Sequence, residues 1–487
     1  MGCLAALKPP YWASIAEGVL NSKIGLKSAY ESLNNLDFEG GFQTIFMVTF
    51  SNTIQSTSAV QSQMLSYIDE ALNQAQRKYK CRVNSDEDWI KYGVARVLHS
   101  HDSGREFFQD LRMESLGELS IKRLDFQEGL KSKRRLEHLT SVNKSYLLAR
   151  SQQAWKSKSG GFSDSLDNFH IYAADGHFHA ASTHEPRDSK GKKNAIGNLY
   201  ALNLRTTDVS HLALSSDGKK KKPHDMGVLK RMDIGALKQG ALKGQKVLYV
   251  WDRACIDFTQ WMHWKHNNAI YFLTRTKENM TKTVIGNIPY DRDDTENSGV
   301  LKNQYIEGGE AIRMVTYHDA QLDKTFEFIT NLHHSIPPGV IVQLYRMRWD
   351  IEKVFDDFKN KLKETKSWAK SITAKRMQAQ FTVLAYNLLL RLHKQTRDQE
   401  ALTEEAVAEK SEARWLETNK IYQGLNRAIP AWLEKHRRVT QLSVKFIRWA
   451  RAMFLRASSW RQSIELLRYE YSLKWSQLLT TDDQSSQ

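Results

Sequence analysis

The apolar positions of the chain follow three successive patterns. From about residue 13 to residue 153 they recur at helical spacing, and from Lys366 to Leu479 they do so again. Between these zones, from Phe169 to about Lys363, short apolar runs typical of strands alternate with helical segments. We therefore expect an α/β core between two helical regions, with the N-terminal region at 1–160, the core at 161–365 and the C-terminal region at 366–487.

Two strands of the middle zone are followed directly by an acid. Phe169–Ala174 predicts a buried strand that ends at Asp175-Gly176, and Val247–Trp251 predicts a central strand that runs into Asp252. Further strands are expected at Leu199–Leu204 and Val209–Leu214, and helices at Met226–Leu242 and Cys255–His266. This order of elements is that of a ribonuclease-H-like fold, in which carboxylates converge at strand ends and on a later helix.

Residues 269–331 interrupt this order. Strands are expected at Ile270–Leu273, Ala311–Tyr317 and Thr325–Thr330, with polar turns such as Asp291–Asp294 between them. We interpret this stretch as a β-rich insertion that separates the second acid from the helix that follows.

The segment Gly339–Leu362 predicts one helix with two distinct rows of side chains. At roughly 100° per residue, one stripe is apolar and consists of Leu344, Met347, Ile351, Phe355, Phe358 and Leu362. Tyr345, Arg348, Glu352 and Lys359 form a polar row beside it. An ordinary i,i+4 Arg–Glu pair on a surface helix explains this row when it is taken alone. The alternative is a cleft in which Glu352 holds a metal ion and the other three side chains contact a phosphate backbone.

The polar row carries a family resemblance. Its spacing, Y-x2-R-x3-E-x6-K, resembles the YREK signature of a large family of bacterial insertion-sequence transposases with a DDE catalytic triad. Asp252-Arg253 resembles the second-acid motif of that family, and Asp175-Gly176 resembles the first. Phe328–Asn331 is similar to the strand that closes the family's β insertion, so the matches cover about Ile171 to Leu362.

The resemblance implies a cofactor and a set of site residues. Asp175, Asp252 and Glu352 would be the catalytic carboxylates and would hold Mg²⁺, with Mn²⁺ as a substitute, in a two-metal site. The residues implied to contact DNA are Tyr345, Arg348, Lys359, Arg253 and Phe326. Phe326 stands where the best-known pattern has Trp and would stack on a flipped base.

The resemblance also implies a reaction and its partners. Water would cut one strand at the end of the element, and the freed 3′-hydroxyl would attack the opposite strand or the target DNA. The partners are then double-stranded DNA, as terminal inverted repeats and target, and a second copy of the chain in a paired-end homodimer.

The first acid has alternative interpretations. An Asp-Gly pair is commonly a simple turn, and Asp175-Gly176 gains weight only from its strand and its partners. The next residue is His177, where the family pattern has a small or hydroxyl residue, and His179 lies on the same strand face. They could hold a transition metal together with Asp175, or lie near DNA phosphates or solvent without a metal.

Composition and charge agree with a DNA-binding protein. The 487 residues carry a formal net charge of +16, which favours a polyanionic partner, nucleic acid before an anionic membrane. Part of the excess lies in the run Lys219–Lys222. Further arginines are interleaved with Trp432, Phe446, Trp449, Phe454 and Trp460, which we expect to pack a helical C-terminal region. The N-terminal helices, with Arg77, Lys78, Lys80, Arg82 and Lys131–Arg135, are the expected reader of the terminal repeat.

The remaining features predict an intracellular protein. Three separate cysteines form no disulfide framework, and no apolar run is long enough to span a bilayer. We expect no membrane contact and a bacterial cytoplasmic location, at the nucleoid when DNA is bound. Two rival functions stay open: a catalytically inactive, transposase-derived DNA-binding protein, and a ribonuclease-H-like nuclease without strand transfer.

Overall fold

The computed structural model describes most of the chain after residue 57. The described residues are 58–74, 86–99, 103–115, 121–156, 162–187, 189–218, 225–308, 310, 312–400, 405–430, 442–454, 456 and 458–479, and all of them belong to the unit Gln55–Gln487. Several residues singled out for their charge or aromatic character lie outside this description, namely Arg77, Lys78, Lys80, Arg82, Lys219–Lys222 and Trp432.

Helices occupy both zones in which helical spacing predicts them. The N-terminal ones are α4 (Ala59–Gln74), α5 (Asp86–His99), α6 (Gly104–Ser115), α7 (Arg123–Gly129) and α8 (Lys133–Lys156). The C-terminal ones are α14 (Ile372–Glu400), α15 (Glu405–Gly424), α17 (Val444–Phe454) and α18 (Trp460–Leu479). The two sets pack together: α14 contacts α4, α5 and α8, and α17 contacts α4 and α5. The predicted flanking regions therefore share one helical layer within this unit.

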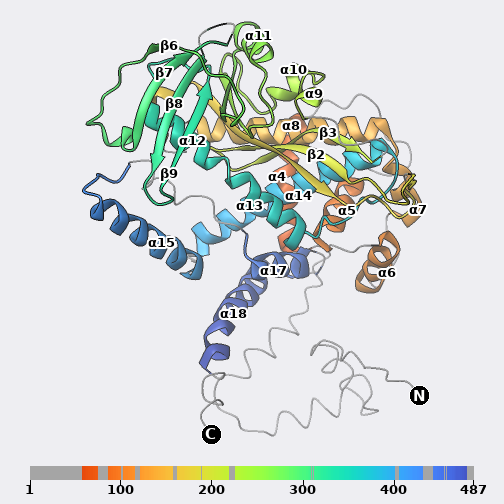
Figure 1. The fold of residues 1–487 in the computed structure, drawn as a ribbon. Helices are drawn as coiled ribbons and strands as arrows, with labels where there is room; N and C mark the ends of the chain where they lie inside the picture. Colours follow the sequence, from red (N-terminus) through yellow and green to blue (C-terminus); the bar gives the residue numbers. More distant parts are fainter. Residues whose placement is uncertain are drawn as a thin grey trace, which may run out of the picture. The chain divides into compact units, whose positions relative to one another are not determined.

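The strands form a single sheet of nine, in the order β3-β2-β1-β4-β5-β9-β8-β7-β6. Figure 1 shows β6 to β9 at one end of this sheet and β2 and β3 at the other. The strands are β1 (Phe169–His179), β2 (Ile196–Asn203), β3 (Val209–Asp217), β4 (Lys246–Trp251), β5 (Ile270–Arg275), β6 (Val284–Asn287), β7 (Val300–Ile306), β8 (Ile312–Asp319) and β9 (Lys324–Thr330). β2 runs antiparallel to both of its neighbours, β1 and β3, whereas β4 and β5 run parallel to β1.

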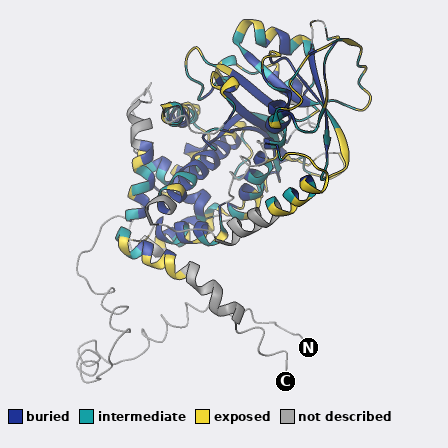
Figure 2. Ribbon diagram, turned by 90° about the vertical axis from the view of Figure 1, so that its left-hand side faces the viewer, coloured by how far each residue is buried: buried dark blue, intermediate teal, exposed yellow. Residues whose placement is uncertain are grey.

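The two faces of the sheet bury separate apolar cores, because successive side chains of a strand point to opposite faces. On β1, Ile171 and Ala173 belong to the core that includes α4, α5, α8, α12 to α14 and α17. Tyr172 and Ala174 belong to the other core, with α9 (Asp225–Leu229), α10 (Ile234–Leu237) and α11 (Phe258–Asn268). Figure 2 shows the central strands of the sheet largely dark blue, as buried.

Several predicted boundaries were wrong for local reasons. β1 does not end at Asp175-Gly176 but continues to His179, because Asp175 and Gly176 pair with Tyr200 and Leu199 of β2. The predicted helix Met226–Leu242 is two short helices, α9 and α10, and Gly240 beyond them has φ +80°. Short 3-10 helices lie at Asp164–Leu166 (η1) and Thr295–Asn297 (η2).

The predicted insertion differs in its start and in its strands. Ile270–Leu273 lies in β5, which pairs in parallel with β4, so it extends the core sheet rather than opening the insertion. β6 and β7 are additional strands that the apolar pattern does not predict. Through β9, which pairs with β5, the inserted strands continue the same sheet.

The predicted helix Gly339–Leu362 is three segments: α12 (Pro338–Met347), α13 (Asp350–Asp356) and a π-helical turn, η3 (Asp357–Lys361). At the first break, Arg348 N–H donates to the Tyr345 carbonyl (3.1 Å) and Glu352 N–H donates to the Trp349 carbonyl (3.1 Å). These three-residue hydrogen bonds tighten the turn and end α12. At the second break, Leu362 N–H donates to the carbonyl of Asp357, five residues earlier, at 2.8 Å.

The apolar predictions for the C-terminal helices are confirmed where the structure describes them. Phe446, Trp449 and Phe454 of α17 are buried, and Trp449 Nε1 donates to the Ser463 carbonyl of α18 at 2.6 Å. Among the described residues, no helix combines the length and apolar character needed to cross a bilayer.

Candidate active site

The first two acids are neighbours because of strand register. β1 and β4 run parallel, and Ala174 lies opposite Trp251 in the last pair of the ladder. Asp175 and Asp252 are the residues that directly follow this pair. They therefore lie next to each other where the ladder between β1 and β4 ends. Each carboxylate accepts a local backbone hydrogen bond: Asp175 Oδ1 from Gly176 N–H (2.7 Å) and Asp252 Oδ1 from Ala254 N–H (3.0 Å).

The third acid is joined to the first by an arginine. Arg348, at the break between α12 and α13, donates from Nη1 to Asp175 Oδ2 at 2.8 Å and from Nη2 to Glu352 Oε1 at 3.1 Å. The Arg348 side chain is 9% exposed, that of Asp175 25% and that of Glu352 40%. A buried guanidinium thus bridges a strand carboxylate and a helix carboxylate.

The charges of this group act on one another. Burial raises the pKa of the Asp175 carboxyl, and the charges of Asp252 and Glu352 raise it further, while Gly176 N–H and Arg348 oppose the rise. Burial by itself lowers the pKa of Arg348, but Tyr345 and the three carboxylates outweigh that effect and raise it. All three acids therefore lie within electrostatic reach of one guanidinium.

The donor set of this group fits a hard divalent cation. Carboxylate oxygens are the protein ligands that Mg²⁺ prefers, and Arg348 already supplies positive charge between Asp175 and Glu352. The ligand atoms of the three acids are not all within 4.8 Å of one another. Among the described residues, the group that meets this spacing is His177, His179 and Glu364.

Tyr345 lies next to Arg348 but is not a surface residue. Its ring packs on Phe328, with centroids 5.0 Å apart, and the Arg348 guanidinium lies 5.8 Å from the ring centroid. Burial raises the pKa of the Tyr345 phenol, and Asp252 adds to the rise while Arg348 and Arg275 oppose it. The phenol therefore stays protonated at neutral pH and keeps a hydrogen to donate.

The other residues predicted to contact DNA differ in exposure. Arg253 and Lys359 are exposed, and the nearest acid recorded for Arg253 is Glu278, at 4.0 Å. Phe326 of β9 is half-buried, with the guanidinium of Arg275 4.9 Å from its ring centroid. No feature of the sequence pattern indicates Arg275, because its closeness to Phe326 depends on the pairing of β5 with β9.

The two histidines after Asp175 have a different acidic neighbour from the one expected. His177 and His179 group with Glu364, which follows η3, and not with Asp175. Burial lowers the pKa of His177 to about 4 and that of His179 to about 3, and it raises the pKa of Glu364 to about 8. At neutral pH both imidazoles are therefore neutral.

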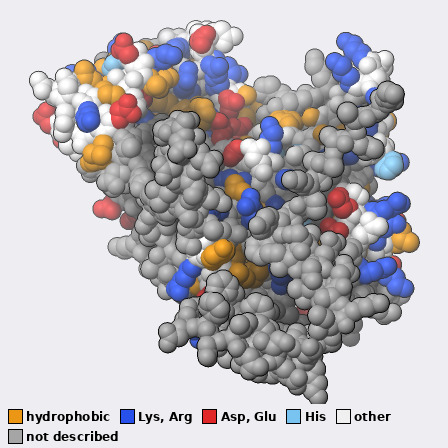
Figure 3. All heavy atoms as spheres, turned by 90° about the horizontal axis from the view of Figure 1, so that it is seen from below, with side chains coloured by type: hydrophobic (Ala, Val, Ile, Leu, Met, Phe, Trp, Pro, Cys, Tyr) orange, Lys and Arg blue, Asp and Glu red, His pale blue; other side chains and the backbone are white. Residues whose placement is uncertain are grey.

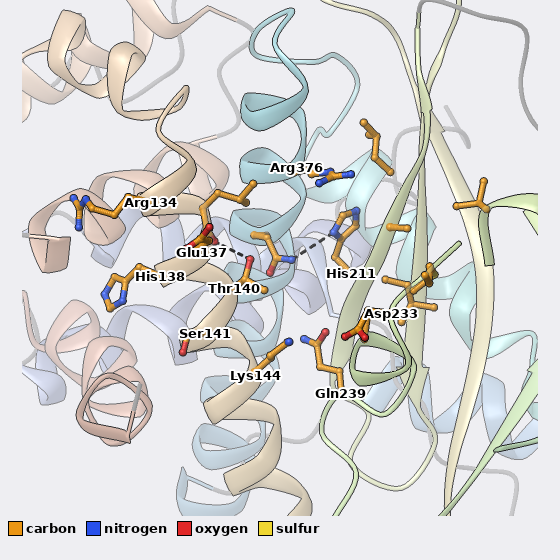
Figure 4. Close-up of a pocket in the computed structure, with 18 of the residues that line it drawn as sticks. Arg134, Glu137, His138, Thr140, Ser141, Lys144, His211, Asp233, Gln239 and Arg376 are labelled. Carbon is orange, nitrogen blue, oxygen red and sulfur yellow. Dashed lines mark hydrogen bonds between the residues drawn. The ribbon is translucent and has the colours of Figure 1, made fainter. Parts of the chain in front are cut away.

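A pocket of about 840 Å³ lies elsewhere, between α8, α14 and β3. Figure 4 shows Arg134 and Lys144 entering from α8, Arg376 from α14 and His211 from β3. None of the three acids lines this pocket. It is therefore a feature separate from the carboxylate group.

On the face drawn in Figure 3, the basic side chains of the described residues do not form one continuous patch. Lys and Arg side chains lie there in several groups, with Asp and Glu side chains between them. The net charge of +16 thus does not by itself locate a DNA-binding surface on this face of the described residues.

Residues 170–388, a little under half of the chain, match the family described as the transposase DDE domain. The matched span begins on β1, ends within α14 and includes Asp175, Asp252 and Glu352. This match supports a DDE transposase, a class of DNA-cleaving enzymes that use divalent metal ions. Membership of the YREK-signature family stays a prediction.

The chain is also similar to the piggyBac transposase in a cryo-EM structure of its synaptic complex with hairpin DNA. The similarity covers 83% of this chain and 84% of that one, with 10% sequence identity and a TM-score of 0.33. No curated protein matches this chain.

Proposed function

We propose that this chain is a cut-and-paste DDE transposase of the YREK-signature family, which binds the terminal inverted repeats of its own insertion sequence, cleaves the ends and joins the 3′ ends to target DNA. The observation that carries the proposal lies within the matched domain: Asp175 and Asp252 follow paired residues of parallel strands, and Arg348 joins Asp175 to Glu352. The strand order β3-β2-β1-β4-β5 supports a ribonuclease-H-like core.

Asp175, Asp252 and Glu352 would hold two Mg²⁺ ions, or Mn²⁺ in their place. Bound divalent ions generate the attacking oxygen nucleophile and stabilise the charge of the phosphate and its leaving oxygen. The protein prepares for this by fixing two carboxylates through sheet register and the third through the bridge to Arg348.

Arg348 and Tyr345 contribute donors for the scissile phosphate. Nε of Arg348 is buried and has no hydrogen-bond partner among the described residues, so a phosphate oxygen would satisfy this N–H once DNA binding opens a path to it. The phenol of Tyr345, protonated at neutral pH, supplies a second donor beside it. Both side chains then orient the phosphate toward the carboxylates rather than taking part in bond making.

Arg253 directly follows Asp252, and Lys359 follows Glu352 on the next turns of the helical segment; both cations are exposed and suit contact with the DNA backbone. Each phosphate contact releases counterions, so loss of one cation flattens the salt dependence of binding by about 0.9 in the log–log slope. Replacing Lys359 by Ala should produce this change, and an unchanged slope would return Lys359 to an ordinary surface role.

Cleavage of the element's own ends tests the proposal. Full-length protein is incubated with labelled DNA that carries the inverted repeats flanking its coding frame, with Mg²⁺ and then with EDTA. We expect strand cleavage that requires the metal, loss of cleavage in Glu352→Ala, and retained end binding in that variant. Glu307→Gln, an exposed carboxylate on the insertion, is the matched control and should cleave as the wild type does.

The same assay separates the rival functions. Binding without cleavage by the wild type would identify a transposase-derived DNA-binding protein. Cleavage without joining of the 3′ ends to a target plasmid would identify a nuclease. Excision of a marked element by Glu352→Ala would show that the third acid is wrongly assigned. Measuring the mass of the protein with paired ends would test the predicted homodimer.

A further inference from the structure

The backbone brings His177, His179 and Glu364 together from distant parts of the chain. His177 and His179 lie two residues apart near the end of β1, so their side chains share one face. An isolated bridge joins Ala180 to Lys366: Ala180 N–H donates to the Thr365 carbonyl and Ser367 N–H donates to the Ala180 carbonyl, both at 2.9 Å. This bridge holds Glu364 beside the strand end.

Four polar atoms of this cluster are buried and have no hydrogen-bond partner among the described residues. The three residues are 6%, 7% and 6% exposed, respectively. Among the described residues, no hydrogen-bond partner reaches His177 Nε2, either ring nitrogen of His179, or Glu364 Oε2. The other carboxylate oxygen of Glu364 accepts from the Thr382 hydroxyl at 3.1 Å. An unsatisfied buried polar atom costs roughly 1–3 kcal/mol, and one bound ion would satisfy three of these four atoms, one from each residue.

The spacing of these atoms suits a metal ion rather than direct hydrogen bonds. His177 Nε2 lies 3.6 Å from Glu364 Oε2, too far for a hydrogen bond, and all ligand atoms of the group lie within 4.8 Å of one another. Atoms at about 2.1 Å from a tetrahedral zinc ion lie roughly 3.4 Å apart. The observed pair is thus close to the separation that zinc requires.

We propose that His177, His179 and Glu364 form a binding site for one Zn²⁺ ion, distinct from the carboxylate group of Asp175, Asp252 and Glu352. Two imidazoles and one carboxylate favour a borderline transition metal over Mg²⁺, which prefers oxygen ligands throughout. Three protein ligands leave the fourth position of a tetrahedral ion to a water molecule, and the buried position favours a structural role. The ion connects β1, which contains Asp175, to the segment that follows η3. That segment continues from α13, the helix that contains Glu352.

Metal binding by the full-length protein tests this site without reference to DNA cleavage. The purified chain is stripped with EDTA, loaded with Zn²⁺ alone, passed over a desalting column and analysed for bound zinc. We expect one zinc per chain in the wild type. In His179→Ala and in Glu364→Gln the affinity should fall by at least about a hundredfold, because each substitution removes a ligand. Co²⁺ in place of Zn²⁺ should give the visible absorption of a four-coordinate ion.

Two controls assign the metal to this cluster. Asp252→Asn changes the carboxylate group and should retain its zinc, as should His211→Asn, which removes a buried histidine elsewhere. Loss of zinc in Asp252→Asn would place the ion among the three acids and overturn the proposal. A wild type that retains no zinc, or a Glu364→Gln variant that retains as much as the wild type, would also overturn it. Should His179→Ala fail to fold, the isosteric Glu364→Gln decides.

Discussion

Replacing Arg348 by Gln removes the one cation that bridges two of the three acids. The guanidinium donates to Asp175 at 2.8 Å and to Glu352 at 3.1 Å, and its side chain is 9% exposed. Glutamine keeps a polar side chain, although a shorter one, and has no charge. The variant therefore leaves Asp175 and Glu352 in place with their mutual repulsion no longer neutralised.

The two hydrogen bonds contribute unequally to stability. A hydrogen bond to a charged group contributes about 1.5–3 kcal/mol when it is largely buried, which suits the pair with Asp175, 25% exposed. Glu352 is 40% exposed, so its pair contributes no more than about 0.2–1 kcal/mol because water screens it. We expect Arg348→Gln to lower the free energy of unfolding by about 2–3 kcal/mol.

Urea unfolding in EDTA, followed by tryptophan fluorescence, measures this loss without a contribution from metal. Arg253→Gln is the matched control, since Arg253 is exposed and its recorded pair with Glu278 is 4.0 Å long. That variant should remain within about 0.5 kcal/mol of the wild type. A double-mutant cycle with Asp175→Asn isolates the buried pair and should give a coupling of about 2 kcal/mol.

Two outcomes would refute this reasoning. Equal stability of Arg348→Gln and the wild type would mean that the guanidinium does not neutralise the acids in the free protein. A coupling near zero with Asp175→Asn would mean that Arg348 stabilises the fold through its packing instead.

Three further changes test other parts of the structure. Lys375→Met breaks a pair with Glu185 at 2.9 Å, whose side chains are 0% and 1% exposed, and should cost about 3–5 kcal/mol, most of which Glu185→Leu should restore in the double variant. Burial lowers the pKa of His211 to about 3. The contribution of this neutral imidazole to the free energy of unfolding is therefore complete above pH 6.5 and is lost as the pH falls, by about 2 kcal/mol at pH 5. His211→Asn should narrow the stability difference between pH 7 and pH 5 by that amount. Gly339→Ala would put a Cβ 1.5 Å from the Glu296 carbonyl oxygen and should cost about 3 kcal/mol or more. Urea unfolding curves measure all three.

Each of these changes has its own control or contrary result. Gly227→Ala has no atom within 4 Å of the new Cβ and should leave stability unchanged or slightly raised. An unaltered pH response in His211→Asn would mean that other buried groups account for the acid sensitivity. A double variant of Lys375 and Glu185 no more stable than Lys375→Met would show that shape, not charge, determines the cost.

The strands of the first half of the core follow from the apolar pattern, because each is a short buried run bounded by polar turns. Phe169–Ala174 lies in β1 and Val247–Trp251 in β4, and both acids follow as expected. The end of β1 was predicted too early in the sequence, because pairing of Asp175 and Gly176 with β2 outweighs the local preference of Asp-Gly for a turn. β6 is mostly exposed, so it has no buried alternation to recognise.

The apolar pattern of the sequence does not predict the two breaks between α12, α13 and η3. Leu344, Ile351 and Phe358 are all buried, so the apolar stripe continues across both breaks. The π turn depends on tertiary partners: the buried Asp357 accepts from the Tyr386 hydroxyl at 3.2 Å and from Leu442 N–H at 3.4 Å. Glu364 could not be foreseen for the same reason, since only the bridge from Ala180 to Lys366 brings it to the histidines.

The position of Arg348 has a consequence for the chain during its synthesis. Asp175 and Asp252 are translated before Arg348, which follows Asp175 by 173 residues and joins it to Glu352. A nascent or prematurely terminated chain that ends before α12 therefore contains the first two acids but neither the third acid nor the bridging cation. Contacts between residues so far apart in the sequence form late in folding, because closing a long loop costs entropy. The complete group of Asp175, Asp252, Glu352 and Arg348 therefore exists only once α13 has docked on β1.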